Sequence, residues 1–229
     1  MPISPKKIPN CVGMIMDGNR RWAKEKGLPQ LEGHRLGYEK LKEATKWARE
    51  AGVQNVIVYA FSTENWNRTE SEVSYLMDLI RLLLTRELEH LKKENIRVLC
   101  LGDRRRFSQD IQTLMDKAEK ETARNNGLTL GLCLSYGGRA EITQAANLAI
   151  SASEPVDEES FSKYLWTSGL PDPDLIIRTG GEQRLSGFLT WQSVYSELFF
   201  AKAYWPAFSK KEFMDIIDEF SNRDRRNGK

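Results

Sequence analysis

The 229-residue chain has few cysteines and no long apolar run, the features that mark disulfide-linked, secreted or membrane proteins. Its three cysteines, Cys11, Cys100 and Cys133, lie far apart without CxxC spacing, each within an apolar run. This predicts buried thiols of a reducing compartment, not disulfides, redox pairs or metal ligands. The first ten residues lack the apolar core of a secretory signal, and no apolar run reaches the roughly 18 residues of a membrane span. We therefore expect a cytoplasmic protein.

Several fingerprints of cofactor and nucleic-acid binding are also missing. There is no GxxxxGK[ST] of a P-loop and no GxGxxG of a dinucleotide site, and no DDxxD pair that would hold a magnesium cluster on helices. The 34 Lys and Arg residues nearly balance the 32 Asp and Glu residues. Because a dedicated nucleic-acid binder usually carries a strong basic excess on one face, we expect no nucleic-acid partner.

What the chain does contain is an alternation of short β-rich runs and longer helical patterns. Runs at 12–16, 55–61, 96–101, 128–135 and 175–179 predict strands, and stretches at about 33–51, 69–94, 108–125, 139–152 and 209–222 predict helices. Apolar strands separated by amphipathic helices are typical of a parallel sheet with helices on both faces. With no linker and no internal repeat, we expect one α/β domain over 1–229.

Each predicted strand is followed by a polar turn that carries arginine. These arginines are Arg20 and Arg21, Arg68, Arg104 to Arg106, Arg139 and Arg184. Ligands of open parallel sheets bind beyond the carboxyl ends of the strands, and guanidinium groups match phosphate oxygens. Strand ending and helix capping would explain any single turn. Five such turns on one edge predict a site for one or more diphosphates.

Asp17 adds a carboxylate to this basic edge, in the turn Asp17-Gly18-Asn19. Proteins commonly hold Mg²⁺ with one or two carboxylates while substrate phosphates complete the coordination shell. We therefore expect a Mg²⁺ cofactor. The alternative is that Asp17 only balances the charge of its neighbours.

The predicted helix around 71–91 is apolar almost all round in its middle, beyond the roughly 100° stripe that one core contact needs. One explanation is burial between the sheet and a neighbour or partner subunit. The other is that part of its surface, with the helix around Leu36 and Leu41, lines a pocket for a long hydrocarbon. A hydrocarbon joined to a diphosphate is a prenyl diphosphate.

Seven strings, in order along the chain, resemble the cis-prenyltransferases, and among them the bacterial undecaprenyl diphosphate synthases. They are MIMDGNRRWA (14–23), GHRLGYEKL (33–41), YAFSTENWNR (59–68), GDRRRF (102–107), SYGGRAEI (135–142), DPDLIIRTGGEQRLSGFLTWQSVYSELFF (172–200) and YWPAF (204–208). The resemblance covers nearly the whole chain, and its long C-terminal block is highly specific.

The resemblance implies an apolar tunnel within the parallel-sheet fold, a homodimer, and a Mg²⁺-dependent reaction. In that reaction isopentenyl diphosphate is added repeatedly to an allylic starter, usually farnesyl diphosphate, and each new double bond is Z. We expect undecaprenyl diphosphate, the precursor of a cell-wall lipid carrier, as the product. A short- or medium-chain product stays open, because product length depends on how the tunnel floor is plugged. The oily product suggests transient peripheral contact with the membrane.

A non-catalytic partner subunit of the same fold is disfavoured. Such subunits lose the catalytic aspartate and the diphosphate cradle, whereas this chain keeps both.

The resemblance also implies residue roles. Asp17 matches the Mg²⁺-positioning aspartate, Glu197 a second carboxylate linked to the metal, and Asn65 a further catalytic residue. The matched allylic diphosphate contacts are Gly18, Asn19, Arg20, Arg21, Trp22, His34 and Arg68. Ser62, Glu64 and Trp66 match the mobile loop over the reacting ends, and Arg178, Arg184 and Ser186 match the isopentenyl diphosphate site. Apart from the resemblance, His34 would be expected only to cap or hydrogen-bond locally.

The chain departs from the family pattern at a few positions. Gln30 stands where some members carry a basic residue near the diphosphate, and Arg20 stands where many bacterial members have glycine. Arg226-Asn227-Gly228 matches a terminal Arg-x-Gly that reaches the partner's isopentenyl diphosphate. A solvated charged tail is the alternative explanation of that segment.

Overall fold

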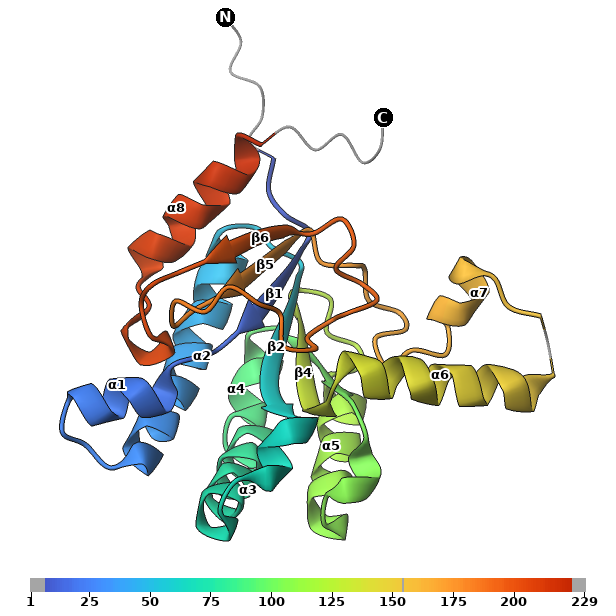
Figure 1. Cartoon of the computed structure of the whole chain (residues 1–229), viewed down its shortest axis with the longest axis horizontal. Coiled ribbons are helices and arrows are strands. Elements are labelled where there is room, and N and C mark those ends of the chain that lie inside the picture. The colour runs from blue at the N-terminus through green and yellow to red at the C-terminus, as the bar shows by residue number, and fades with distance from the viewer. Residues whose placement is uncertain (1–6, 154, 224–229) are drawn as a thin grey trace, which may run out of the picture.

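A six-stranded parallel sheet forms the centre of the molecule in the computed structural model, which describes residues 7–153 and 155–223 (Figure 1). The strands are β1 (Cys11–Ile15), β2 (Asn55–Ser62), β3 (Arg97–Leu101), β4 (Thr129–Tyr136), β5 (Leu175–Arg178) and β6 (Glu197–Phe200). Their spatial order is β3-β4-β2-β1-β5-β6, and all neighbours pair in parallel. The predicted single α/β domain with a parallel sheet is confirmed.

Five strands lie where the apolar runs predicted them, and β6 is an addition. Only four residues long, it pairs with β5 alone, at the edge of the sheet. Its Leu198 is 38% exposed, whereas the four residues of β5 are all buried. A short strand with an open side lacks the continuous apolar run by which the others were predicted.

Eight α-helices connect the described strands. They are α1 (Asn19–Glu25), α2 (Gln30–Glu50), α3 (Glu70–Thr85), α4 (Leu88–Lys93), α5 (Gln109–Thr122), α6 (Gly138–Ala152), α7 (Glu158–Ser162) and α8 (Lys210–Ser221). The short helices α1 and α7 were not predicted. The helix predicted over 69–94 divides into α3 and α4, while the other four predicted helices are confirmed within a few residues.

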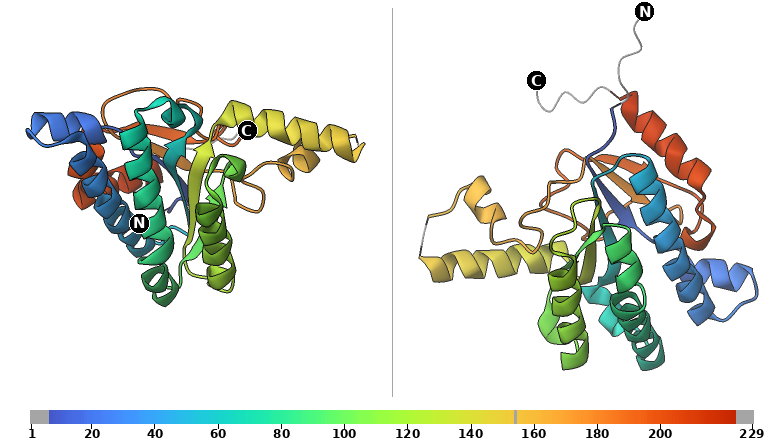
Figure 2. Two further views of the ribbon diagram at one scale, coloured as in Figure 1. Left: turned by 90° about the horizontal axis from the view of Figure 1, so that it is seen from below. Right: turned by 180° about the vertical axis from the view of Figure 1, so that it is seen from behind.

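The two faces of the sheet are covered differently. On one face Val12, Met14, Val56 and Val58 pack under α2, α3, α4, α5 and α8 in one large apolar cluster. On the other face a smaller cluster includes Phe188 and Leu189, from the mostly non-helical segment 163–196. Helices therefore flank the sheet, as predicted, but most of them lie on one face (Figures 1 and 2).

Helix α6 joins the second face through a buried polar cluster at its start. The carboxylate of Glu141 is fully buried and accepts hydrogen bonds from Tyr136, Thr167 and Gln192. Beyond this anchor α6 projects from the rest of the molecule, with α7 beside it (Figures 1 and 2). The projecting part carries Leu148 and Ile150, which are 46% and 75% exposed.

The prediction that the cysteines are buried is confirmed. All three are buried free thiols, and burial is the main factor that raises the pKa of Cys100 to about 12. Among the described helices, none combines the length and the hydropathy needed to cross a bilayer.

Candidate functional site

The predicted polar turns gather at one edge because all six strands point the same way. Arg178 ends β5 beside Ile15, the last residue of β1, and Asp17 lies just beyond. The Nη2 of Arg178 donates a hydrogen bond to Oδ2 of Asp17 at 2.8 Å, and Nη2 of Arg21 lies 3.2 Å from the same oxygen. One carboxylate just after β1 thus holds two guanidinium groups, one at the end of β5 and one on α1.

Arg178 is also fixed on its far side. Its Nη1 donates to Oγ of Ser186 at 2.9 Å and to the main-chain oxygen of Arg184. Its Nε has no hydrogen-bond partner, and water cannot supply one because the atom is buried and the side chain is only 5% exposed. Of the three residues predicted to bind isopentenyl diphosphate, Arg178 and Ser186 therefore meet directly. The 61%-exposed side chain of Arg184 instead pairs with Glu182 at 2.5 Å.

The electrostatics around Asp17 keep its carboxyl group ionised. Burial raises its pKa, but the hydrogen bond and charge of Arg178 and the charge of Arg21 outweigh burial, so the pKa lies below its ordinary value. Both ion pairs use Oδ2. An ionised carboxylate held in this way can still offer its other oxygen to a cation.

An ionised carboxylate beside two guanidinium groups fits Mg²⁺, and it does not fit a metal held by protein ligands alone. No three His, Cys, Asp or Glu side chains converge anywhere in residues 7–153 and 155–223. Mg²⁺ retains much of its hydration and commonly takes only one or two carboxylates, with substrate phosphates as further ligands. Asp17 is the residue at this edge that could hold it.

Helix α1 approaches α2 closely because of two glycines. A Cβ atom on Gly33 would lie 2.2 Å from the main-chain oxygen of Asn19, and one on Gly37 would lie 2.5 Å from its Oδ1. Gly18, with φ +103°, similarly has no room for a Cβ beside Tyr204. The spacing of the GHRLG string thus has a packing cause: it brings α1 and the adjoining turn onto α2.

A carboxylate that the sequence analysis did not select organises the second half of the site. Glu72, at the start of α3, is only 5% exposed. Its Oε1 lies 2.9 Å from Nε2 of His34 and accepts a 2.8 Å hydrogen bond from Nη1 of Arg68, while Arg20 approaches Oε2 at 3.7 Å. Thr69 and Glu72 have the spacing of an ordinary helix capping box, which conceals this role in the sequence.

The pKa values of this cluster follow from burial and charge. Burial is the largest effect on His34 and lowers its pKa, with the charges of Arg68 and Arg20 acting in the same direction and Glu72 opposing them. Burial raises the pKa of Glu72, but His34, Arg68 and Arg20 outweigh it and leave that pKa below its ordinary value. Glu72 is therefore an anion whose neighbours are all cationic or can become so.

The segment predicted as a mobile loop forms a short 3₁₀ turn, η1 (Thr63–Asn67), packed against the sheet. The main-chain N–H of Ser62 donates to Oδ1 of Asn65 at 3.1 Å. Trp66 stacks edge-on against Phe61 and Phe107, and its Nε1 donates to Oγ of Ser135 at 3.0 Å. Glu64 accepts a hydrogen bond from Thr63. Ser62 and Asn65 face the cavity described next.

A cavity of about 210 Å³ leads from Asp17, His34 and Arg68 into the space between α2 and α3. Away from these polar groups its walls are apolar, with Tyr38 and Leu41 from α2 and Leu76, Leu79, Ile80 and Leu83 from α3. The all-round apolar character of α3 is thus explained by a pocket on one side and core packing on the other.

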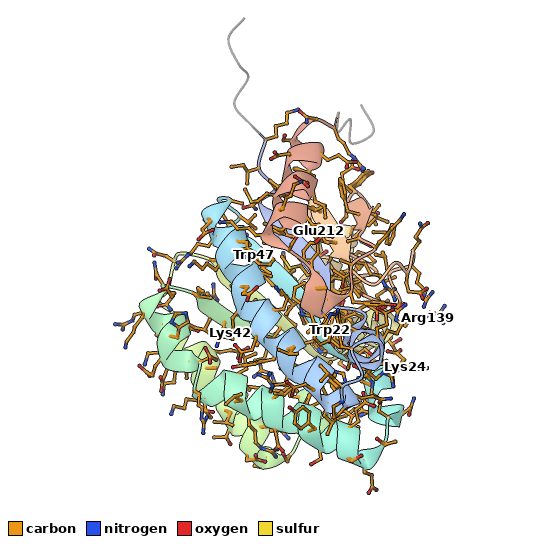
Figure 3. The ribbon with its side chains drawn as sticks, turned by 90° about the vertical axis from the view of Figure 1, so that its left-hand side faces the viewer. Trp22, Lys24, Lys42, Trp47, Arg139 and Glu212 are labelled. Atoms are coloured by element: carbon orange, nitrogen blue, oxygen red, sulfur yellow. The ribbon has the colours of Figure 1, made fainter. Side chains whose placement is uncertain are left out.

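A second cavity of about 250 Å³ continues beyond the first, and both are lined by Leu41 and Leu83. Its inner wall includes Leu91, Ile96 and Leu130, and its rim carries the ion pairs Lys42–Glu87 and Arg49–Glu94 between α2 and the α4 region. In Figure 3, Lys42 lies on this flank of α2 and Trp47 on the opposite flank, toward α8. The apolar space where the tunnel was predicted thus consists of two chambers, and we call Leu41 and Leu83, which line both, the waist between them.

Comparison with known proteins identifies the family. The prenyltransferase family described as "Putative undecaprenyl diphosphate synthase" matches residues 15–228. The chain belongs to this family of cis-prenyltransferases. The isoprenyl transferase of Agrobacterium fabrum is 47% identical over 100% of this chain and 96% of its own length, and that of Thermotoga maritima is 44% identical over 97% of each. The predicted family resemblance and the classification as an enzyme are therefore confirmed.

Solved structures agree with the sequence relatives. The lavandulyl diphosphate synthase of Lavandula x intermedia, solved with dimethylallyl diphosphate, superposes with a TM-score of 0.92. It is 32% identical over 97% of this prenyltransferase and 99% of that chain. A probable undecaprenyl diphosphate synthase from Campylobacter jejuni gives a TM-score of 0.83 at 32% identity, over 97% of this chain and 100% of that one.

The structure does not bring Glu197 to Asp17. Glu197 begins β6 in register with Leu175, at the amino end of the sheet, and its carboxylate pairs with Arg223 at 2.5 Å. Asp17 lies beyond the carboxyl ends of the strands, at the opposite edge. Within a single chain of this prenyltransferase the two carboxylates therefore do not meet, and the metal role expected for Glu197 stays a prediction.

Of the other predicted residues, some border the site and others only make local structural contacts. Arg104 bonds to Asp116 and Glu119 on α5, and the 83%-exposed Arg105 pairs with Asp103. The arginines after β3 thus have local acidic partners. Trp22 is half-buried on α1 (Figure 3). It does not line the first cavity, whereas Asn19 does. Arg226-Asn227-Gly228 lies outside the described residues.

Proposed function

We propose that this prenyltransferase adds isopentenyl diphosphate units stepwise to an allylic diphosphate, with Mg²⁺ as cofactor and farnesyl diphosphate as starter. The observation that carries the proposal is the continuity between the charged edge and the apolar chamber: Asp17, His34 and Arg68 border the same cavity as Leu41, Ile80 and Leu83. A diphosphate with a hydrocarbon tail matches both ends of that cavity. A hydrophilic nucleotide would match only the charged end of the cavity.

In this proposal the allylic diphosphate lies among Arg21, Arg68 and His34, with Gly18, Asn19 and Arg20 shaping the cradle and Trp22 beside it. Guanidinium groups bind phosphate oxygens bidentately and stabilise the charge that grows on a departing diphosphate. Asn65, with Ser62, Glu64 and Trp66, holds the opposite wall near the reacting carbons. Mg²⁺ held by Asp17 would supply electrophilic stabilisation of the diphosphate charge.

The homoallylic partner, isopentenyl diphosphate, is proposed to bind at Arg178, Ser186 and Arg184. The unpartnered Nε of Arg178 supports this, because a buried donor without an acceptor is costly unless a ligand supplies one. Arg178 also contacts Asp17, so the two diphosphates would lie side by side across that ion pair. Holding two reactants in such a geometry can contribute about 7 to 11 kcal/mol of the barrier reduction.

We propose undecaprenyl diphosphate, for lipid-carrier synthesis, as the product. A chain of that length needs both chambers, since the first, at about 210 Å³, is smaller than the roughly 300 Å³ at which drug-sized pockets begin. The waist at Leu41 and Leu83 favours a second candidate, a short- or medium-chain Z-prenyl diphosphate synthase whose product ends in the first chamber.

We also propose a homodimer that works in the cytoplasm with transient membrane contact. Val194 and Tyr195, beside the edge strand β6, are 73% and 65% exposed, and Ile150 on the projecting α6 is 75% exposed. Apolar side chains at an open sheet edge are the kind of surface that a second copy can cover.

One assay tests the reaction. The protein is incubated with farnesyl diphosphate, radiolabelled isopentenyl diphosphate and Mg²⁺, and the dephosphorylated products are sized by thin-layer chromatography. We expect a product ladder that ends near C55 and disappears with EDTA. A ladder that ends one or a few additions beyond the farnesyl starter supports the shorter-chain candidate, and no extension at all rejects the prenyl transfer proposal.

A further inference from the structure

We propose that Glu72 is a positioning residue that turns the Nε2–H of His34 away from the substrate, so that His34 binds the allylic diphosphate through Nδ1 as an imidazolium and takes up a proton when the diphosphate binds. This inference rests on the proposed function, because it assigns the cavity at His34 to an allylic diphosphate.

The position of Glu72 behind the site is the first step. His34 and Arg68 line the first cavity, but Glu72 does not. Its carboxylate is reached by side chains from three parts of the chain: Arg20 on α1, His34 on α2, and Arg68 just before α3. Glu72 therefore acts on a bound substrate through the groups that it holds.

The hydrogen-bond chemistry of the pair fixes the histidine tautomer. An ionised carboxylate only accepts hydrogen bonds, so the Nε2 that lies 2.9 Å from Glu72 must carry a proton. Glu72 stays ionised because Arg68 donates to the same Oε1 and the cluster holds its pKa below the ordinary value. Neutral His34 is then protonated at Nε2 and bare at Nδ1.

His34 lines the first cavity, and with Nε2 bound to Glu72 only Nδ1 is left for a ligand. In the neutral ring this nitrogen is in the wrong state to bind an anion. Nδ1 makes no hydrogen bond with any residue in 7–153 and 155–223, and it is not among the buried polar atoms sealed from solvent. A bare Nδ1 is an acceptor and repels phosphate oxygens. Only a proton taken up from solvent makes it a donor, and the ring is then a cation at both nitrogens.

The charges around His34 are balanced so that a bound diphosphate decides whether the ring is neutral or an imidazolium. Arg20 from α1 and Arg68 disfavour the imidazolium, Glu72 from α3 favours it, and burial disfavours it most. A diphosphate adds negative charge on the Nδ1 side and reverses that balance. Proton uptake and diphosphate binding then favour each other, since linkage between two sites is reciprocal.

The direct test is nitrogen NMR of the wild-type protein labelled at histidine, with inorganic diphosphate as the probe. The chain has only two histidines, and the exposed His90 on α4 serves as an internal control. We expect neutral His34 at high pH to show a protonated Nε2 and a bare Nδ1. Saturating diphosphate should move the His34 titration midpoint to higher pH, while the spectrum of His90 should not respond to diphosphate.

Variants then connect the tautomer to Glu72. In Glu72→Gln the His34 midpoint should fall and its displacement by diphosphate should shrink. Glu70→Gln, on the same turn of α3 but exposed, should behave as wild type. At pH 8 the KM for farnesyl diphosphate should rise about tenfold or more in Glu72→Gln, as loss of a charge-assisted hydrogen bond predicts, while kcat changes less. Glu72→Asp should restore part of the pH dependence.

The outcomes are separable. A neutral His34 protonated at Nδ1, or diphosphate that binds without moving the His34 titration, overturns the inference even if the enzyme is active. These two measurements use wild-type protein, so they hold even if Glu72→Gln does not fold. Absence of any chain extension rejects the proposed function, whichever tautomer is found.

Discussion

The charged edge and the apolar chambers are built on opposite principles. At the edge, Arg178, Arg21 and Arg68 are held in place before any substrate binds, by Asp17 and Glu72. Between α2 and α3, aliphatic side chains wall the first cavity away from the charged edge, and the second cavity has an apolar inner wall with charged residues at its rim. The charged edge is fixed by directional hydrogen bonds, whereas the chambers depend only on which side chains fill the space.

This difference separates two properties of the enzyme. In the proposed reaction, directional groups decide whether the two diphosphates meet in a reactive geometry, because the stabilising effect of such groups depends steeply on position. Nonpolar walls offer a roughly constant gain per buried area, so they decide how far a chain can extend. Changes at the edge should therefore alter rates, and changes at the waist should alter product length. The following variants test that separation, from the largest expected effect to the smallest.

Asp17→Asn should have the largest effect. It keeps the shape and an acceptor for Arg178 but removes the charge that would hold Mg²⁺, so we expect kcat to fall on the order of 10³-fold, about 4 kcal/mol. Single-turnover rates measure this, and circular dichroism checks that the fold remains. Product length among the residual products should not change. A variant with near-normal turnover would show that Asp17 has no role in the chemistry.

Arg178→Lys tests geometry at constant charge. A lysine cannot reach Asp17, Ser186 and the main chain of Arg184 together, so the KM for isopentenyl diphosphate should rise about 10- to 100-fold. The matched control is Arg105→Lys at an exposed ion pair, which should leave both rate and KM unchanged. Equal effects in both variants would mean that the buried arrangement of Arg178 is unimportant.

Leu83→Ala should change product length with little effect on the initial rate. It widens the waist shared by the two chambers, so the product ladder should shift to longer chains. The cost in stability should be near the lower end of the usual 2 to 5 kcal/mol, because Leu83 already borders cavities. Leu84→Ala is the control: Leu84 is 1% exposed and lines neither chamber, so it should destabilise without lengthening products. Identical ladders from both variants would contradict the assigned waist.

The smallest effect expected is a pH dependence of stability from His34. Its folded pKa lies below the ordinary value near 6.5, so the unfolded chain takes up the proton first as the pH falls. The free energy of unfolding should therefore decrease on acidification below about pH 6.5. Urea unfolding at pH 7.5 and 5.5 measures the loss. His34→Gln should reduce the difference, and an unchanged slope would show that His34 does not titrate in this window.

Much of the fold was predictable because the buried strands leave a local signal. The runs that became β1, β2, β4 and β5 are continuous and apolar, and each pairs with a neighbour on both sides. The polar turns after them could be placed on one edge without knowing any contact, since parallel strands end on the same side. Asp17, Arg178 and Ser186 were found in this way or through the family resemblance.

Other features depended on partners distant in the chain. Glu72 has the sequence context of a capping residue, and only the packing of α1 and α2 against α3 makes it a buried anion. The family resemblance implied that Glu197 is a second carboxylate linked to the metal at Asp17, but the register of β6 places Glu197 at the far edge of the sheet. No local pattern encodes such a register, because a four-residue edge strand has few interior side chains to fix it.

The sequence by itself determined the alternation of strands and helices, the single basic edge and the family, because hydrophobic periodicity and short motifs are properties of neighbouring residues. The tertiary structure alone decided which charges meet and where the apolar space narrows. Hydrogen bonds such as His34–Glu72 and walls such as Leu41 and Leu83 join residues about 40 positions apart. Their distances are set by helix packing, which depends on the summed shape of many side chains.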